Sequence, residues 1–252
     1  MYRAFNLGDL HFKSELWMIK GASLIAANKT SVTKALDAFL VDGKLEGTEM
    51  TETWFPEIKA DVFISHSHKD KRLALQLAGW LSSKFNITPF IDSAVWGSAD
   101  NLLKQVDDAL CLNPGGQTYS YEKRNESTSH VHMMLATALA KMIDKTECVI
   151  FVSTPNSITA AEAVEKTCSP WIFYELAMVG QTRRRLPAEH RPILKEAVFG
   201  AKRALDEILI EYEVDLSALT TIDADILNEW KRQFEEKLPD FPLDILYDIA
   251  PE

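Results

Sequence analysis

A carboxylate stands in the middle of an apolar segment, "CSPWIFYEL", which covers residues 168–176. The proline near its start and the large apolar side chains after it predict the first turns of a buried helix. Burial makes the charged form of a carboxylate costly, so Glu175 calls for an explanation. Trp171 precedes Glu175 by four residues and therefore shares its helix face, where the indole would keep water away from the carboxylate.

Other polar side chains stand at the ends of short apolar runs. Ser65 closes the run "ADVFIS" and His66 follows it, while Asp92 and Trp96 lie at the end of "ITPFID" or just beyond it. Polar residues also follow a third run, "CVIFV": Ser153, Thr154 and Asn156. Each candidate has a plainer explanation, because a serine or histidine can cap the next helix, an aspartate can form a turn and a tryptophan can fill the core.

Four histidines raise the question of a zinc site. They form two His-x-His pairs, His66 with His68 and His130 with His132. No cysteine, aspartate or glutamate stands with them at a familiar metal-binding spacing, and histidines that are solvated or cap helices are commoner than ligands. We therefore predict that the protein binds no metal.

The charge and the cysteines narrow the class of partner. The chain has 252 residues and a formal net charge of −10, which argues against general affinity for nucleic acid or an anionic membrane. Its three cysteines form neither a metal-binding pattern nor a disulfide framework, as expected in a reducing cytoplasm. The apolar stretch "GASLIAAN" is too short to cross a bilayer, so we expect it to belong to a folded segment. We predict a cytoplasmic protein that binds neither nucleic acid nor a membrane.

Strands and helices alternate through the middle of the chain. Residues 60–65, 87–92 and 148–152 are short apolar runs that predict buried strands. Apolar side chains recur at helical spacing between and after them, over residues 73–85, 102–110, 134–143 and 168–176. This order predicts an α/β fold with a flavodoxin-like, doubly wound parallel sheet, whose ligands bind beyond the carboxyl ends of the strands.

The outer parts of the chain predict extensions around this domain. Residues 32–40 have the spacing of an amphipathic helix, residues 208–216 alternate like a half-exposed edge strand, and residues 223–237 predict a final helix. We accordingly divide the chain into an N-terminal helical extension (1–58), the α/β domain (59–217) and a C-terminal helical extension (218–252). Within the domain, residues 112–129 predict a long polar loop and residues 158–167 an insertion.

Four segments carry a family resemblance: "DVFISHSHKDK", "FIDSAVWG", "VIFVSTPNS" and "SPWIFYEL". In this order they resemble the successive sequence boxes of Toll/interleukin receptor (TIR) domains, especially the bacterial ones, over residues 60–180. The resemblance implies an enzyme that takes NAD+ as its substrate, needs no cofactor and releases nicotinamide, in antiphage defence of the Thoeris type. It implies that Glu175, in a Trp-x-x-x-Glu helix, is catalytic and that the substrate-binding residues are Ser65, His66, Asp92, Trp96 and Trp171.

The chemistry of NAD+ cleavage agrees with a lone carboxylate. Breaking the bond between ribose and nicotinamide builds positive charge on the sugar, which a carboxylate stabilises. Nicotinamide leaves readily, so one carboxylate suffices. The alternative is a TIR adaptor without catalytic activity that acts by self-association, and such an adaptor has no need of Glu175. A phosphoacceptor receiver domain would need an acidic pair after the first strand, where this chain has "SHSH".

The product and the partners follow less directly. The loop at 112–129 and the insertion at 158–167 depart from the family pattern and flank the expected site, so the choice between linear and cyclic ADP-ribose stays open. We expect the chain to associate with itself, as TIR domains commonly do. We also expect an effector protein that senses its nucleotide product.

Overall fold

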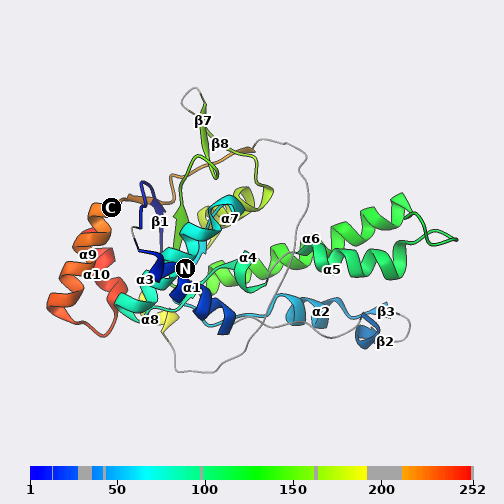
Figure 1. The fold of residues 1–252 in the computed structure, drawn as a ribbon, viewed down its shortest axis with the longest axis horizontal. Helices are drawn as coiled ribbons and strands as arrows, with labels where there is room; N and C mark the ends of the chain where they lie inside the picture. Colours follow the sequence, from blue (N-terminus) through cyan, green and yellow to red (C-terminus); the bar gives the residue numbers. More distant parts are fainter. Residues whose placement is uncertain are drawn as a thin grey trace.

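The computed structural model describes residues 1–12, 14–27, 36–41, 44–96, 99–161, 164–191 and 212–250. Five parallel strands form its central sheet, in the order β10-β1-β6-β4-β5 (Figure 1). Their bounds are β1 (Arg3–Leu7), β4 (Val62–Ser65), β5 (Pro89–Phe90), β6 (Cys148–Val152) and β10 (Thr220–Ile222). The prediction of an α/β fold with a parallel sheet is confirmed.

The strand order explains where a ligand would bind. After β4 the chain forms β5 on one side and then returns past β4 to form β6 on the other side. The order β5-β4-β6 is that of the first three strands of a flavodoxin-like sheet, so the point at which the order reverses lies between β4 and β6. Ligands of such sheets bind in the crevice outside the carboxyl ends of the strands at this switch point.

Strand β1 corrects the predicted N-terminal organisation. Residues 1–58 were expected to form a helical extension, but Arg3–Leu7 pairs with β6 along its whole length, from Arg3↔Cys148 to Leu7↔Val152. Arg3 interrupts the apolar pattern expected of a buried strand. Its guanidinium donates hydrogen bonds to the Tyr247 carbonyl and to Thr220 Oγ1. In the sheet, β1 holds the place that the fourth strand of a flavodoxin-like chain would hold, although it comes first in the sequence.

The last strand of the sheet is also not the predicted one. Residues 208–216 were expected to be its edge strand; 208–211 lie outside the described residues, and Tyr212–Glu213 forms β9 in a second sheet. There β9 pairs antiparallel with β8 (Val164–Thr167), which pairs with β7 (Thr159–Ala161). The insertion at 158–167 thus contains the strands of a hairpin. In the central sheet the outer place belongs to β10, within the predicted C-terminal helical extension 218–252.

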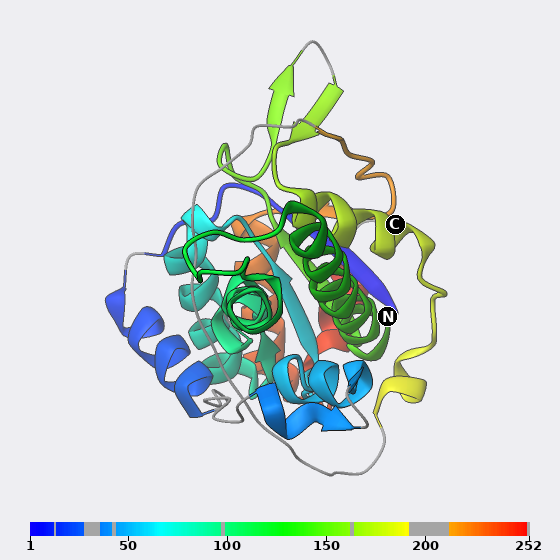
Figure 2. The ribbon, with the colours of Figure 1, turned by 90° about the vertical axis from the view of Figure 1, so that its right-hand side faces the viewer.

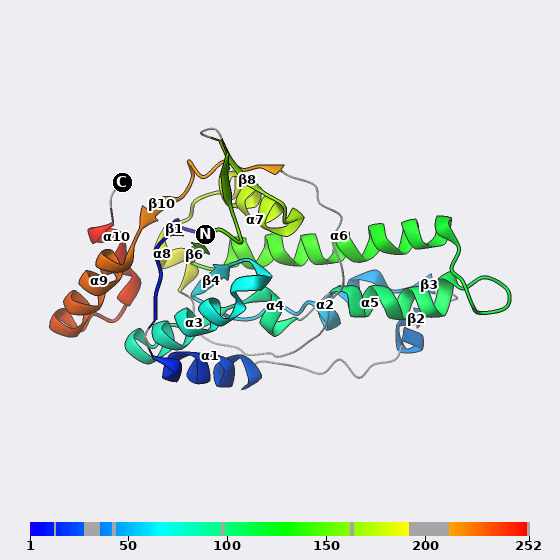
Figure 3. The same ribbon diagram turned by 45° about the horizontal axis from the view of Figure 1, so that its top comes forward.

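Helices cover both faces of the sheet (Figure 2). Helices α1 (Glu15–Ala27) and α3 (Lys71–Phe85) lie on one face, and α6 (Tyr121–Lys145) and α7 (Pro170–Gln181) lie on the other. Helix α6 extends well beyond the sheet beside α5 (Ala99–Val106), so that the pair projects as an arm (Figure 3).

The arm corrects the predicted loop at 112–129, because α6 already begins at Tyr121. Ser120 caps this helix, with its hydroxyl accepting a hydrogen bond from the Lys123 amide. The first turns of α6 are largely exposed, so they carry few of the periodic apolar side chains that would have identified a helix.

The remaining elements complete the described fold. They are η1 (Leu36–Phe39), β2 (Leu40–Val41), β3 (Lys44–Leu45), α2 (Gly47–Trp54), η2 (His68–Asp70), α4 (Asp92–Val95), η3 (Asp107–Cys111, a π-helix), α8 (Pro187–His190), α9 (Ala224–Lys237) and α10 (Pro242–Ile249). Helix α9 confirms the helix predicted for residues 223–237. Of the helix predicted for residues 32–40, residues 32–35 lie outside the described residues, and the rest is η1 and β2 rather than α-helix.

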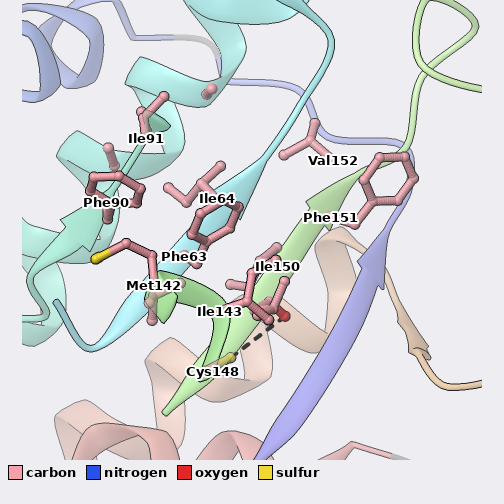
Figure 4. Packing of buried hydrophobic residues seen from close by; sticks show 14 of the residues in the cluster. Phe63, Ile64, Phe90, Ile91, Met142, Ile143, Cys148, Ile150, Phe151 and Val152 are labelled. Carbon is pink, nitrogen blue, oxygen red and sulfur yellow. Dashed lines mark hydrogen bonds between the residues drawn. The ribbon is translucent and has the colours of Figure 1, made fainter. Parts of the chain in front are cut away.

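The core is centred on β4 and β6. All five residues of β6 are buried, as predicted for a strand covered on both faces. Phe63 and Ile64 of β4 lie beside Ile150 of β6, and Phe151 lies farther along β6 (Figure 4). A rigid pair of strands therefore supports the residues at their carboxyl ends. Among the described helices, none has both the length and the apolar character that a membrane span requires.

Candidate active site

Glu175 lies on the second turn of α7 and faces the end of β4. The helix begins as expected, with Pro170 in its first turn and the hydroxyl of Ser169 accepting a hydrogen bond from the Ile172 amide at 3.2 Å. The Glu175 side chain is 4% exposed, and Ser65, the last residue of β4, donates a hydrogen bond from Oγ to Glu175 Oε2 at 2.5 Å. The fold thus brings together two residues that are 110 positions apart in the sequence.

The surroundings of Glu175 disfavour its charged form. Burial raises its pKa well above the usual value, and the negative charge of Asp92 raises it further, whereas the hydrogen bond from Ser65 lowers it. A carboxylate held at such a cost, at the place where this fold binds ligands, is typical of a functional site rather than of a structural one.

His66 adds a buried imidazole to the same place. The side chain is 6% exposed, and its Nε2 lies 3.3 Å from the hydroxyl oxygen of Ser93. Its Nδ1 is buried without a hydrogen-bond partner among the described residues. Burial lowers the pKa of His66, against the opposite effect of Asp92, so the neutral ring is favoured. A buried polar atom without a well-aligned partner is unusual, although the Ile64 backbone also acts on the pKa of this ring.

Asp92 connects these two groups electrostatically. It is the first residue of α4, directly after the β5 end of the sheet, and it is half-buried. Its negative charge raises the pKa of Glu175 and that of His66, so Asp92 lies near both side chains. The structure therefore gathers four of the six predicted site residues: Ser65, His66, Asp92 and Glu175.

Trp171 lies at the margin of this group. It is half-buried on α7, and its ring meets the His132 ring of α6 edge-on, with centroids 5.4 Å apart. Tyr174 donates a hydrogen bond to the Ala136 carbonyl at 2.9 Å, so α7 is anchored on α6 beside Glu175. His132 thus packs on α7.

Nowhere in the described ranges do three or more His, Cys, Asp or Glu side chains gather as metal ligands would.

Trp96 packs in the core, and its predicted role in substrate binding stays a prediction. It is 2% exposed and packs against the rings of Phe55 and Phe90, with centroids 5.7 Å and 4.9 Å away. Its indole donates a hydrogen bond to the Pro56 carbonyl at 2.9 Å. The position after a strand end is compatible with either role, and packing turned the indole into the core.

Two further polar residues near the site, Ser93 and Asp70, are not among the predicted site residues. Ser93 follows Asp92 at the end of a strand, and its hydroxyl oxygen lies 3.3 Å from Nε2 of His66. Asp70, in the segment after His66, accepts hydrogen bonds from Thr154 and Asn156, the residues that follow β6. Only the three-dimensional arrangement shows that this aspartate meets the third strand end.

A pocket of about 410 Å³ lies at the opposite edge of the sheet. Its lining includes Asp61 and Glu147, which immediately precede β4 and β6, and Arg191. Arg191 makes ion pairs with Glu147 and with Asp244, both at 2.7 Å. The buried carboxylate of this pocket, Glu147, is therefore paired with a cation.

Comparisons with known proteins add no relative to this picture: no family model, no curated protein and no solved structure matches the chain. The account of the site therefore rests on its own geometry.

Replacing Ser65 by alanine tests how Glu175 is controlled. The hydroxyl of Ser65 stabilises the charged carboxylate, so its loss is expected to raise the pKa of Glu175 further. Any activity that needs the ionised carboxylate should then require a higher pH, so the acidic limb of the pH–rate profile should move to higher pH. Ser129→Ala is the matched control, because Ser129 is an exposed residue of α6 whose hydroxyl donates to the Asn125 carbonyl. Superimposable profiles for Ser65→Ala and the unmodified chain would show that Ser65 does not lower the pKa of Glu175.

Proposed function

We propose that the protein is a TIR-like enzyme that cleaves the bond between ribose and nicotinamide in NAD+. The observation that carries the proposal is the buried carboxylate of Glu175, held by Ser65 at the switch point of a flavodoxin-like sheet. The resemblance of residues 60–180 to TIR domains supplies the reaction, and the strand order agrees with it.

The reaction uses the charge of Glu175. As the C1′–N bond breaks, its electron pair passes to the ring nitrogen, so the cationic pyridinium leaves as neutral nicotinamide. Positive charge develops on the ribose, and the Glu175 carboxylate stabilises it in a site with little water. Water then attacks C1′ and loses a proton, which gives ADP-ribose; attack by a nucleophilic nitrogen of the same molecule would give a cyclic product instead.

The neighbouring side chains have separate roles in this reaction. Ser65 orients one oxygen of Glu175, which leaves the other for a ribose hydroxyl or the developing charge. Asp92 adds negative charge near Glu175, where positive charge develops on the ribose, and Nδ1 of His66 can accept or donate a hydrogen bond to the substrate. A cationic substrate also helps Glu175 to ionise, because a nearby positive charge lowers the pKa of a carboxyl group.

An adaptor that acts by self-association is the second candidate. It is favoured by the apolar side chains exposed along the projecting arm, which would suit contacts between copies: Leu110, Leu112, Tyr121 and Met133. An adaptor, however, gains nothing from a desolvated carboxylate.

For the enzyme we propose a role in bacterial defence through a nucleotide product or through loss of NAD+.

Nicotinamide release from NAD+ is the deciding measurement. We expect the purified chain to release nicotinamide and ADP-ribose, or a cyclic isomer, with a rate per molecule that rises with protein concentration if copies assist one another. Chromatography of the reaction at several protein concentrations separates these products. Absence of nicotinamide at every concentration, with light scattering showing oligomers, would favour the adaptor.

A further inference from the structure

Asp70 joins the two loops that border the switch point. Its Oδ2 accepts a hydrogen bond from Thr154 Oγ1 at 2.5 Å, and its Oδ1 accepts one from Asn156 Nδ2 at 2.8 Å. Asp70 lies in the segment after β4, whereas Thr154 and Asn156 lie after β6. The two hydrogen bonds therefore connect the ends of the neighbouring strands β4 and β6, between which a flavodoxin-like fold binds its ligand.

The pairing register shows where the two loops leave the sheet. Ser65, the last residue of β4, stands opposite Phe151 of β6. Asp70 and Thr154 lie a few residues beyond this last pair along the chain, after the ends of β4 and β6. The Asp70 hydrogen bonds thus join the loop that follows Ser65, the partner of Glu175, to the loop that follows β6.

Each loop is itself held in shape. The Asp70 amide donates to the Ser67 carbonyl at 2.8 Å, and the Thr154 amide donates to the hydroxyl oxygen of Ser157, also at 2.8 Å. Ser157 in turn donates to the carbonyl of Val152, the last residue of β6. The contact therefore ties together two ordered loops that are anchored on buried strands.

The Asp70 carboxylate does not cap the helix that begins beside it. Asp70 stands at the N-cap position of α3, but its side chain makes no capping hydrogen bond to that helix. Aspartate is favoured at such a position because it can cap. Here both carboxylate oxygens are directed to the loop after β6 instead.

We propose that Asp70, Thr154 and Asn156 form a clasp that holds the active site closed, and that its release admits the substrate to Glu175. Ser65, His66 and Glu175 are all buried, so a substrate can reach them only if the surrounding chain opens. The identity of the substrate rests on the proposed function. The closure itself rests on the hydrogen bonds and the burial alone.

The clasp is tested by the chemical accessibility of Glu175. Asp70→Ala removes both acceptor oxygens, and Asp70→Asn keeps an acceptor oxygen. Thr154→Val keeps the shape of the side chain but removes the donor to Asp70 and the acceptor of the Asn156 amide. Labelling of intact protein with a water-soluble carbodiimide and an amine, followed by peptide mass spectrometry, reports how fast Glu175 reacts. Thr51→Val on α2 is the matched control, because its hydroxyl bonds to the Gly47 carbonyl, away from the site.

Glu147 is an internal standard in the same molecules, since it is as buried as Glu175 but precedes β6 at the opposite edge. We expect Asp70→Ala to label Glu175 roughly tenfold faster, the factor that corresponds to about 1.4 kcal/mol. Thr154→Val and Asp70→Asn should give smaller increases, and Glu147 should stay unchanged in each variant. The apparent KM for NAD+ should fall in the same order, because less free energy is spent on opening.

The outcomes separate the clasp from the proposed function. Faster labelling of Glu175 in a protein that releases no nicotinamide under any condition would uphold the clasp and overturn the NAD+ reaction. Unchanged labelling in both Asp70→Ala and Thr154→Val would overturn the clasp, whatever the activity. Equal acceleration at Glu147 and Glu175 would show general loosening and would also overturn it.

Discussion

Glu175→Gln is expected to lower the rate of nicotinamide release ~10²- to 10³-fold, the usual cost of losing one preorganised electrostatic group. Glutamine keeps the size of the side chain and can still accept the hydrogen bond from Ser65, but it carries no charge for the developing cation. The loss should appear in kcat and in kcat/KM together, because the charge acts mainly in the transition state. Steady-state assays of nicotinamide release provide this measurement.

The same variant should stay folded, and its stability should depend on pH in a definite direction. The folded protein raises the pKa of Glu175, so it binds this proton more tightly than the unfolded chain does. The native state therefore loses stability as the pH rises from the ordinary carboxyl value towards the raised one. Glu175→Gln removes this loss, so its melting temperature should match the unmodified chain below about pH 4 and exceed it near neutrality.

Glu126→Gln is the matched control, because Glu126 is an exposed residue of α6 and loses the same charge. It should change neither turnover nor the pH dependence of melting. Near-normal turnover in Glu175→Gln would remove Glu175 from the mechanism. Lost turnover in a protein that no longer melts cooperatively would leave the catalytic assignment without support and would point to a structural role.

Gly79→Ala is expected to have the largest effect on stability. Helices α1 and α3 cross so closely that a Cβ on Gly79 would lie 1.9 Å from the Trp17 carbonyl oxygen, and a Cβ on Gly21 would lie 1.9 Å from the Leu75 carbonyl oxygen. These obstacles are backbone atoms, which cannot rotate away as a side chain can. Overpacking of this kind should cost ~3 kcal/mol or more, which lowers the melting temperature by roughly 6–12 °C in a chain of this size.

Gly180→Ala serves as the matched control for the helix crossing. Gly180 lies in α7, and a Cβ there would meet nothing within 4 Å. Alanine should therefore stabilise the protein by up to about 1 kcal/mol, through helix propensity alone. Thermal unfolding of the three proteins measures both effects. A Gly79→Ala variant as stable as the unmodified chain would mean that α1 does not pack against α3 at this distance.

The sequence alone determined the local elements that support the site. The runs at β4, β5 and β6 are short and apolar because these strands are buried on both faces, and such runs need no tertiary information to be identified. Pro170 and the apolar residues after it likewise predicted the start of α7, and the apolar spacing near the C-terminus predicted α9. These signals are local because hydrophobic periodicity and capping act over a few residues.

The tertiary structure decided which residues meet. The hydrogen bond between Ser65 and Glu175 joins a strand end to a helix face far along the chain, and no local pattern specifies that distance. The same holds for β1, whose five residues gain their strand structure by pairing between β6 and β10. Trp96 shows the reverse case: a residue at the expected edge turned inward, because an indole gains more from contact with Phe55 and Phe90 than from exposure.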